Sequence, residues 1–205
     1  MIIKVCGMRL GQNIREVEAL GVDWIGMIFY PPSPRYVAIK PDYMPRKAKR
    51  VGVMVDESTP AICRRVADYG LHMVQLHGNE SPQQCREIKD AMPQVNIIKA
   101  LSIKDYDSLD ATADYEECGA VDYFLFDTYC KEKGGSGLTF DHSLLQRYQG
   151  HTPFLLSGGL SPQNVEDIKA LSHPMLIGYD LNSRFETAPA IKDPQLIKQF
   201  IAALK

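Results

Sequence analysis

The alternation of short apolar runs with helical segments constrains the fold of this chain more than any other feature. Eight runs have strand character, at positions 2–5, 23–29, 50–55, 72–76, 95–101, 121–126, 153–156 and 175–179. Segments typical of helices or helical loops follow at 10–20, 59–69, 81–92, 103–118, 142–148, 161–171 and 193–204. The first of these repeats apolar side chains at helical spacing, at Leu10, Ile14, Val17 and Leu20. Strands that alternate with helices predict a parallel sheet covered by helices.

Eight such units predict a closed (β/α)₈ barrel formed by a single domain, residues 1–205. No linker or low-complexity segment divides the chain. A doubly wound open sheet is the alternative, but that fold usually has fewer strands and a glycine-rich turn after its first strand. Here the glycine-rich segments follow later strands, at 134–137 and 158–159. The sequence therefore favours the barrel.

Charge and composition argue against several classes of partner. The chain has 23 Lys and Arg against 25 Asp and Glu, which gives no reason to expect binding to nucleic acid or to an anionic membrane surface. No apolar run approaches the roughly 20 residues of a membrane-spanning helix, and the chain opens without the regions of a signal peptide. Five scattered cysteines without a C-x-x-C pair indicate neither a zinc site nor a disulfide framework. We therefore expect a cytoplasmic protein.

Reactive side chains follow several of the predicted strands, whose C-terminal ends meet at one mouth of a barrel. Cys6 and Asp127, from the first and sixth strands, can face each other as a base and an acid. Each also has a structural interpretation, Cys6 as a small buried apolar residue and Asp127 as the cap of a turn. Arg35, in a proline-rich loop at 30–36, offers a planar fork for a carboxylate, or is simply solvated. His77 fits the lining of the mouth better than a catalytic role.

The late turns of the barrel have the composition of a phosphate site. Glycine allows the backbone to approach an anion closely, so that N–H groups can point at it. The loops after strands seven and eight are where barrels commonly bind phosphate. The predicted phosphate-binding residues are Gly135, Gly137, Gly158, Gly159, Asn182, Ser183 and Arg184.

Motifs along the whole chain resemble the phosphoribosylanthranilate isomerase family of tryptophan biosynthesis. They begin with Lys4-Val5-Cys6-Gly7, Ser33-Pro34-Arg35-Tyr36-Val37, Val51-Gly52-Val53 and Gln75-Leu76-His77-Gly78. They continue in the family's order with Asp127-Thr128, Gly135-Ser136-Gly137, Phe140-Asp141, Ser157-Gly158-Gly159-Leu160, Asn164-Val165 and Lys192-Asp193.

The resemblance implies a barrel enzyme without cofactor or metal whose small-molecule substrate is N-(5-phosphoribosyl)anthranilate and whose reaction is an Amadori rearrangement. In that family the residues matching Cys6 and Asp127 are the general base and the general acid. The residue matching Arg35 holds the anthranilate carboxylate, and the one matching Asp180 contacts the sugar; we expect His77 to contact the substrate as well. The sequence leaves open whether the protein is a monomer or a homodimer.

The chain departs from the family pattern in two places. The last phosphate turn reads Asn182-Ser183-Arg184 instead of Ser-Ser-Gly, and Ala190 replaces a glycine before the final Lys-Asp. We expect the backbone N–H of Arg184 to serve the phosphate while its side chain turns to solvent, with negative φ. Two other functions fit a phosphate-binding barrel: a different sugar-phosphate enzyme, such as an epimerase that needs a metal or a second carboxylate, and a non-catalytic metabolite sensor.

Overall fold

The chain forms a closed barrel of eight parallel strands. The computed structural model describes residues 1–105, 107–128 and 142–204. The strands are β1 (Ile2–Val5), β2 (Trp24–Ile28), β3 (Lys49–Met54), β4 (Met73–Leu76), β5 (Asn96–Ile103), β6 (Tyr123–Thr128), β7 (Phe154–Ser157) and β8 (Leu176–Leu181). They follow one another in sequence order, and β8 closes the ring by pairing in parallel with β1. The predicted barrel is confirmed, and the open sheet is excluded.

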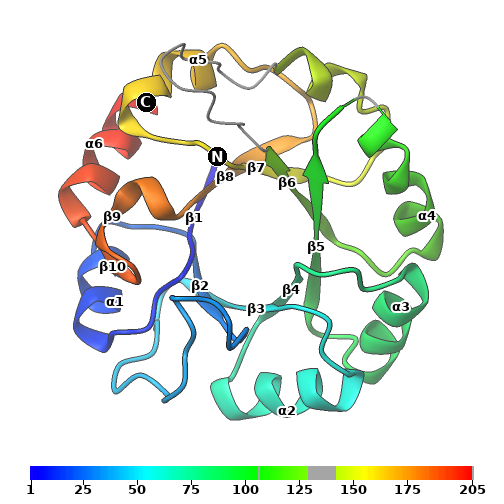
Figure 1. Cartoon of the computed structure of the whole chain (residues 1–205), viewed down its shortest axis with the longest axis horizontal. Helices are drawn as coiled ribbons and strands as arrows, with labels where there is room; N and C mark the ends of the chain where they lie inside the picture. Colours follow the sequence, from blue (N-terminus) through cyan, green and yellow to red (C-terminus); the bar gives the residue numbers. More distant parts are fainter. Residues whose placement is uncertain (106, 129–141, 205) are drawn as a thin grey trace.

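Helices surround this ring on its outside (Figure 1). They are α1 (Gly11–Glu18), α2 (Thr59–Tyr69), α3 (Pro82–Ala91), α4 (Ala111–Cys118), α5 (Val165–Lys169) and α6 (Pro194–Leu204). Short 3₁₀ segments lie at Asp107–Leu109, His142–Arg147, Pro162–Asn164 and Ser183–Phe185. None of the helices in the described part of the chain is long and apolar enough to span a membrane.

Local sequence signals explain the best-predicted helices. α2 spans the residues expected, with Pro60 in its first turn and Gly70 in the left-handed conformation after its last, at φ +58°. α3 begins after Ser81, whose hydroxyl accepts a hydrogen bond from the backbone N–H of Gln84. Proline is well suited to the first helical positions because it has no N–H to leave unpaired there.

Three expected helices differ most from the prediction. β5 extends to Ile103, so that α4 begins only at Ala111, and 142–147 winds as a 3₁₀ segment. The helix expected from 161 begins as a 3₁₀ turn, in which the Asn164 side chain accepts a hydrogen bond from the Ser161 N–H at 2.9 Å. Periodicity predicts that a segment is helical but does not fix where the hydrogen-bonding pattern starts.

A hairpin between β8 and α6 was not predicted. It consists of β9 (Glu186–Ala188) and β10 (Ile191–Lys192), which pair antiparallel. Ala190 lies in its turn with φ +67°, a left-handed conformation that is costly for a residue with a Cβ. This is the position at which the family pattern has glycine.

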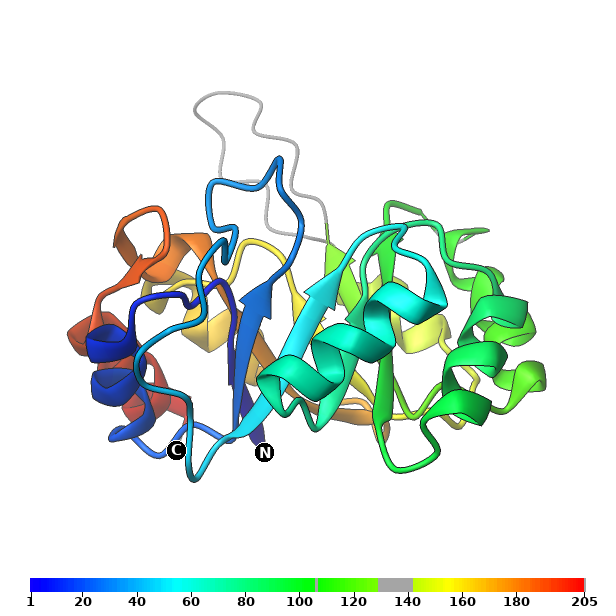
Figure 2. The ribbon, with the colours of Figure 1, turned by 90° about the horizontal axis from the view of Figure 1, so that it is seen from below.

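The inside of the barrel is apolar at one end and polar at the other. An apolar cluster from β2 to β7 fills one end with Trp24, Val51, Met73, Ile98, Ala100, Leu125 and Leu155. Because side chains alternate along a strand, Lys4 and Gln75 lie two positions further toward the C-terminal ends of β1 and β4 than Ile2 and Met73. The C-terminal ends face the top of Figure 2, where the loop after β2 rises, and both chain termini lie at the opposite side.

Candidate active site

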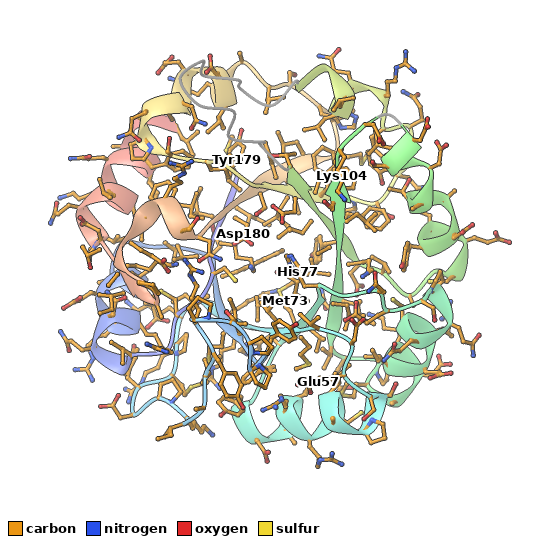
Figure 3. The ribbon with its side chains drawn as sticks, in the orientation of Figure 1. Glu57, Met73, His77, Lys104, Tyr179 and Asp180 are labelled. Carbon is orange, nitrogen blue, oxygen red and sulfur yellow. The ribbon has the colours of Figure 1, made fainter. Side chains whose placement is uncertain are left out.

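A cavity of about 340 Å³ opens at the C-terminal ends of the strands. It brings together most of the predicted site residues: Cys6, Arg35, His77, Asp127, Gly158, Gly159, Asp180, Asn182 and Ser183. Figure 3 labels His77 and Asp180 inside the ring of strands, from opposite sides of it. Arg184 is exposed and is not one of the lining residues. Gly135 and Gly137 lie outside the described residues.

Cys6 follows β1 and is buried. It fits because β2 carries glycine at position 26, where a Cβ would lie only 2.8 Å from the Cys6 sulfur. Burial raises the pKa of the Cys6 thiol, and the ammonium groups of Lys4 and Lys192 oppose this effect. The Asp180 carboxylate adds to the effect of burial, so the pKa of Cys6 stays above its usual value although the two cations favour the thiolate.

Lys4 and Asp180 form a buried ion pair next to Cys6. They are direct neighbours in the register of β1 and β8, and Lys4 Nζ lies 2.8 Å from Asp180 Oδ2. Burial works against the charged ammonium, but Asp180 and Cys6 raise the pKa of Lys4, so it remains a cation. Asp180 lies within β8, not in the turn after it as predicted. Asp180 lines the cavity, and its Oδ1 is a buried acceptor without a hydrogen-bond partner in the described structure.

On the opposite side, Gln75, His77 and Asp127 form a second polar row. The Gln75 amide nitrogen lies 2.7 Å from His77 Nδ1, and His77 Nε2 lies 3.8 Å from Asp127 Oδ2. With Gln75 as donor, the neutral imidazole carries its proton on Nε2, toward Asp127. Gln75 is fully buried, and its Oε1 has no partner among the described residues. The Asp127 side chain is 40% exposed and lines the cavity.

The Arg35 guanidinium is already bound to a carboxylate of the protein. Its Nε donates to Glu186 Oε1 at 2.9 Å, and its Nη2 donates to Glu186 Oε2 at 2.6 Å. The Arg35 side chain is 18% exposed, so the interpretation as a solvated loop residue is wrong. Its predicted role toward a substrate carboxylate stays a prediction.

The two glycines after β7 adopt left-handed conformations, with φ +91° at Gly158 and +64° at Gly159. A Cβ at Gly158 would lie 2.1 Å from the carbonyl oxygen of Thr128, so glycine is needed here for packing against β6. In the turn after β8, Asn182 Oδ1 accepts a hydrogen bond from Lys192 Nζ at 2.8 Å. Arg184 has no positive φ, as predicted; among the described residues that conformation occurs, outside glycine, at Asp56 and Ala190.

Four polar residues of the site were not predicted: Lys4, Gln75, Glu186 and Lys192. The alternation of a strand contains a signal for the first two, because Lys4 is two residues before Cys6 and Gln75 is two before His77. Glu186 and Lys192 reach the site through the hairpin, for which the sequence contains no periodic signal.

The sequence model of the N-(5'-phosphoribosyl)anthranilate (PRA) isomerase family matches residues 3–203 of this chain. The chain belongs to this family. It is 50% identical over 205 residues to the N-(5'-phosphoribosyl)anthranilate isomerase of Phocaeicola vulgatus, covering 100% of this chain and 98% of that protein.

Solved structures of the family have the same fold. The phosphoribosyl anthranilate isomerase of Thermotoga maritima is 32% identical and superimposes with a TM-score of 0.84, covering 100% of this chain and 98% of that one. A further isomerase structure contains reduced 1-(o-carboxyphenylamino)-1-deoxyribulose 5-phosphate. That structure is 29% identical to this chain and has a TM-score of 0.81, with coverage of 100% and 98%.

Proposed function

We propose that this protein isomerises N-(5'-phosphoribosyl)anthranilate to 1-(2-carboxyphenylamino)-1-deoxyribulose 5-phosphate by acid–base catalysis. The proposal rests mainly on one observation: Cys6, Asp127 and Arg35 line the same cavity. The chain that carries them belongs to the isomerase family. Membership of the family supports the reaction, and the cavity supports the assignment of its residues.

The walls of the cavity suit the three parts of this substrate. The turns that contain Gly158, Gly159 and Ser183 offer backbone groups to the phosphate. Asp180 and Gln75 line the cavity and offer a carboxylate and an amide group to the ribose hydroxyl groups. Arg35 carries the positive charge for the anthranilate carboxylate.

Asp127 acts first, as the general acid. Its proton passes to the ribose ring oxygen, the bond from that oxygen to C1′ breaks, and the nitrogen lone pair forms a C1′–N iminium bond. This step requires Asp127 in its protonated form. His77 Nε2 lies 3.8 Å from Asp127 Oδ2, so the imidazole is a close neighbour of the acid in the cavity.

Cys6 then acts as the general base. The iminium group makes the C2′ proton acidic, the Cys6 thiolate removes it, and the electron pair forms the C1′–C2′ double bond of an enolamine. Lys4 and Lys192 stabilise the thiolate as counter-charges. The ketose forms when C1′ gains a proton and the C2′ hydroxyl loses one, so that the protons balance and both catalytic groups return to their starting states.

The proposal also covers the location, cofactor requirement and partners of the enzyme. We propose a single-domain cytoplasmic protein that requires no cofactor or metal and has a small-molecule substrate, with no nucleic-acid or membrane partner. The net charge of −2 supports the last point. Both a monomer and a homodimer are compatible with the sequence.

Turnover without metal tests the proposed function. Purified protein is incubated with phosphoribosylanthranilate in the presence of EDTA, and the product is identified by mass spectrometry and NMR. We expect complete conversion to the aminodeoxyribulose phosphate. Turnover that requires an added metal would indicate a different sugar-phosphate enzyme, and binding without turnover would indicate a sensor.

A further inference from the structure

A row of four side chains connects the loop after β2 with the turn after β8, both of which line the cavity. Arg35, from the loop after β2, binds Glu186 of β9; Glu186 binds Lys192 of β10, and Lys192 binds Asn182 in the turn after β8. Resting on the proposed function, we propose that Glu186 is a positioning residue that aims the Arg35 guanidinium at the substrate carboxylate and couples it to the phosphate turn.

The geometry of the Arg35–Glu186 contact leaves half of the guanidinium available. Glu186 takes the edge formed by Nε and Nη2, at 2.9 and 2.6 Å. A guanidinium has five N–H donors, so the Nη1 group and the outer N–H of Nη2 form a second fork on another edge. That fork can bind a substrate carboxylate in two places while Glu186 stays bound. Glu186 therefore fixes the plane of Arg35 without competing for the ligand.

The charges of the row favour an anionic ligand. Lys192 Nζ lies 2.5 Å from Glu186 Oε1, and its side chain is fully buried. Burial opposes the charged carboxylate, but hydrogen bonds from Arg35 and Lys192 lower the pKa of Glu186, so it is ionised at neutral pH. Burial lowers the pKa of Lys192, and the Glu186 carboxylate opposes this effect. The Arg35 guanidinium carries the charge that faces a substrate carboxylate.

The hairpin holds Glu186 and Lys192 in place through its backbone. The Asn13 side chain of α1 accepts from the Lys192 N–H at 2.8 Å and donates to the Lys192 carbonyl at 2.9 Å. The Ala190 N–H, in its left-handed turn, donates to Glu186 Oε1 at 3.2 Å. A rigid support of this kind is what a positioning residue requires, because the orientation of a two-point contact depends on it.

The row also passes directly beside the proposed base. A Cβ at Gly7, the residue after Cys6, would lie 2.6 Å from Arg35 Cδ and 3.0 Å from Asn182 Oδ1. Both ends of the row therefore pack on the backbone that carries Cys6. A substrate held by Arg35 is placed in a fixed relation to the thiol.

The test compares two inert ligands in the intact protein. The first is reduced 1-(o-carboxyphenylamino)-1-deoxyribulose 5-phosphate, the compound in the related isomerase structure. The second is the same molecule without its carboxyl group. Dissociation constants are measured by calorimetry for the wild type, Glu186→Gln, Arg35→Ala and the double variant, and thermal unfolding confirms that each protein is folded.

We expect Glu186→Gln to weaken binding of the carboxylated ligand at least ~10-fold and that of the second ligand less than ~3-fold. In the Arg35→Ala background the same change should have an effect of less than ~2-fold on either ligand, because Glu186 acts through Arg35. Glu57→Gln is the matched control: Glu57 also accepts from an arginine Nε, that of Arg65 at 3.3 Å, but does not line the cavity. Figure 3 shows Glu57 beside α2, away from the centre. It should leave both constants unchanged.

Several results would overturn the inference. Equal weakening of both ligands would mean that Glu186 only supports the hairpin, and tighter binding of the carboxylated ligand would mean that Glu186 competes with it. Equal losses with and without Arg35 would break the link between the two residues. If Glu186→Gln does not fold, Glu186→Asp replaces it, with an expected loss of carboxylate preference of at least ~3-fold. A wild type that does not prefer the carboxylated ligand would contradict the proposed function itself, whereas a preference that survives Glu186→Gln contradicts only this inference.

Discussion

Gly26→Ala tests whether the position of the Cys6 sulfur limits catalysis. The new methyl group would lie 2.8 Å from Cys6 Sγ and 3.1 Å from Cys6 Cα. Ordinary contacts begin near 3.4 Å, so the sulfur must retreat by about 0.6 Å. Rotation of the side chain alone does not relieve the clash, because the Cα is also too close. The Cys6 segment, whose N–H donates to the Leu181 carbonyl of β8, has to move as a whole.

This displacement gives the expected magnitude. A shift of about 1 Å at a catalytic group costs roughly 100-fold in rate, so about 0.6 Å should reduce kcat by roughly 10- to 100-fold. That range corresponds to about 1.4–2.7 kcal/mol of transition-state free energy. Overpacking of a well-packed site also destabilises the fold by about 1–3 kcal/mol. The melting temperature should fall by about 2–4 °C for each kcal/mol in a chain of this size.

Gly52→Ala separates the effect on catalysis from the loss of stability. A Cβ at Gly52 would lie 2.4 Å from Leu71 Cδ1, so it overpacks β3 against the ends of side chains outside the cavity. Initial rates and melting temperatures are compared for both variants. We expect both to lose stability and only Gly26→Ala to lose kcat by 10-fold or more. A folded Gly26→Ala protein with kcat within three-fold of the wild type would refute the reasoning.

Three further predictions concern the surroundings of the base and the two departures from the family pattern. Lys4→Met removes a cation that lowers the pKa of the Cys6 thiol, so the midpoint pH of Cys6 alkylation by iodoacetamide should rise. Asp180→Asn removes a charge that raises this pKa, so it should lower the midpoint, and shifts of the same sign in the two variants would contradict the account. Arg184→Gly should change kcat/KM by less than about 10-fold, equivalent to about 1.4 kcal/mol. A loss of ~100-fold in kcat/KM, mainly from an increase in KM, would instead show that the arginine side chain binds the phosphate. Ala190→Gly should raise the free energy of unfolding, measured in denaturant, by up to about 1 kcal/mol, because glycine adopts the left-handed conformation of this turn without the strain that alanine has. A decrease would show that alanine at φ +67° is not strained here.

The sequence predicts the barrel well because each strand and helix has a signal within its own short segment. Each strand is a short apolar run and each helix a periodic segment, and Ser81 with Pro82 marks a start that the structure confirms. Boundaries are less certain where strands extend beyond their apolar runs. β8 continues through Asp180 to Leu181. A charged residue at position 180 suggests the end of a buried strand, but the ion pair with the Lys4 ammonium allows Asp180 to be buried within β8.

The candidate site is predicted only in the parts that carry reactive groups at strand ends. Its supporting contacts join residues far apart in the chain: Lys4 and Asp180 are separated by 176 positions, and Arg35 and Glu186 by 151. No local pattern contains such a pair. Glu186 in particular has the appearance of a surface residue in a short polar segment until the hairpin places it against Arg35.

The most direct test of the account is the turnover of Cys6→Ala and Asp127→Asn with phosphoribosylanthranilate. Both changes keep the shape of the cavity and leave Arg35 and the phosphate turns in place, so the reduced product analogue should still bind within a few-fold of its affinity for the wild type. We predict that kcat falls at least ~100-fold in each variant, because one loses the base and the other the acid. Turnover within a few-fold of the wild type in either folded variant would contradict the assignment of Cys6 and Asp127.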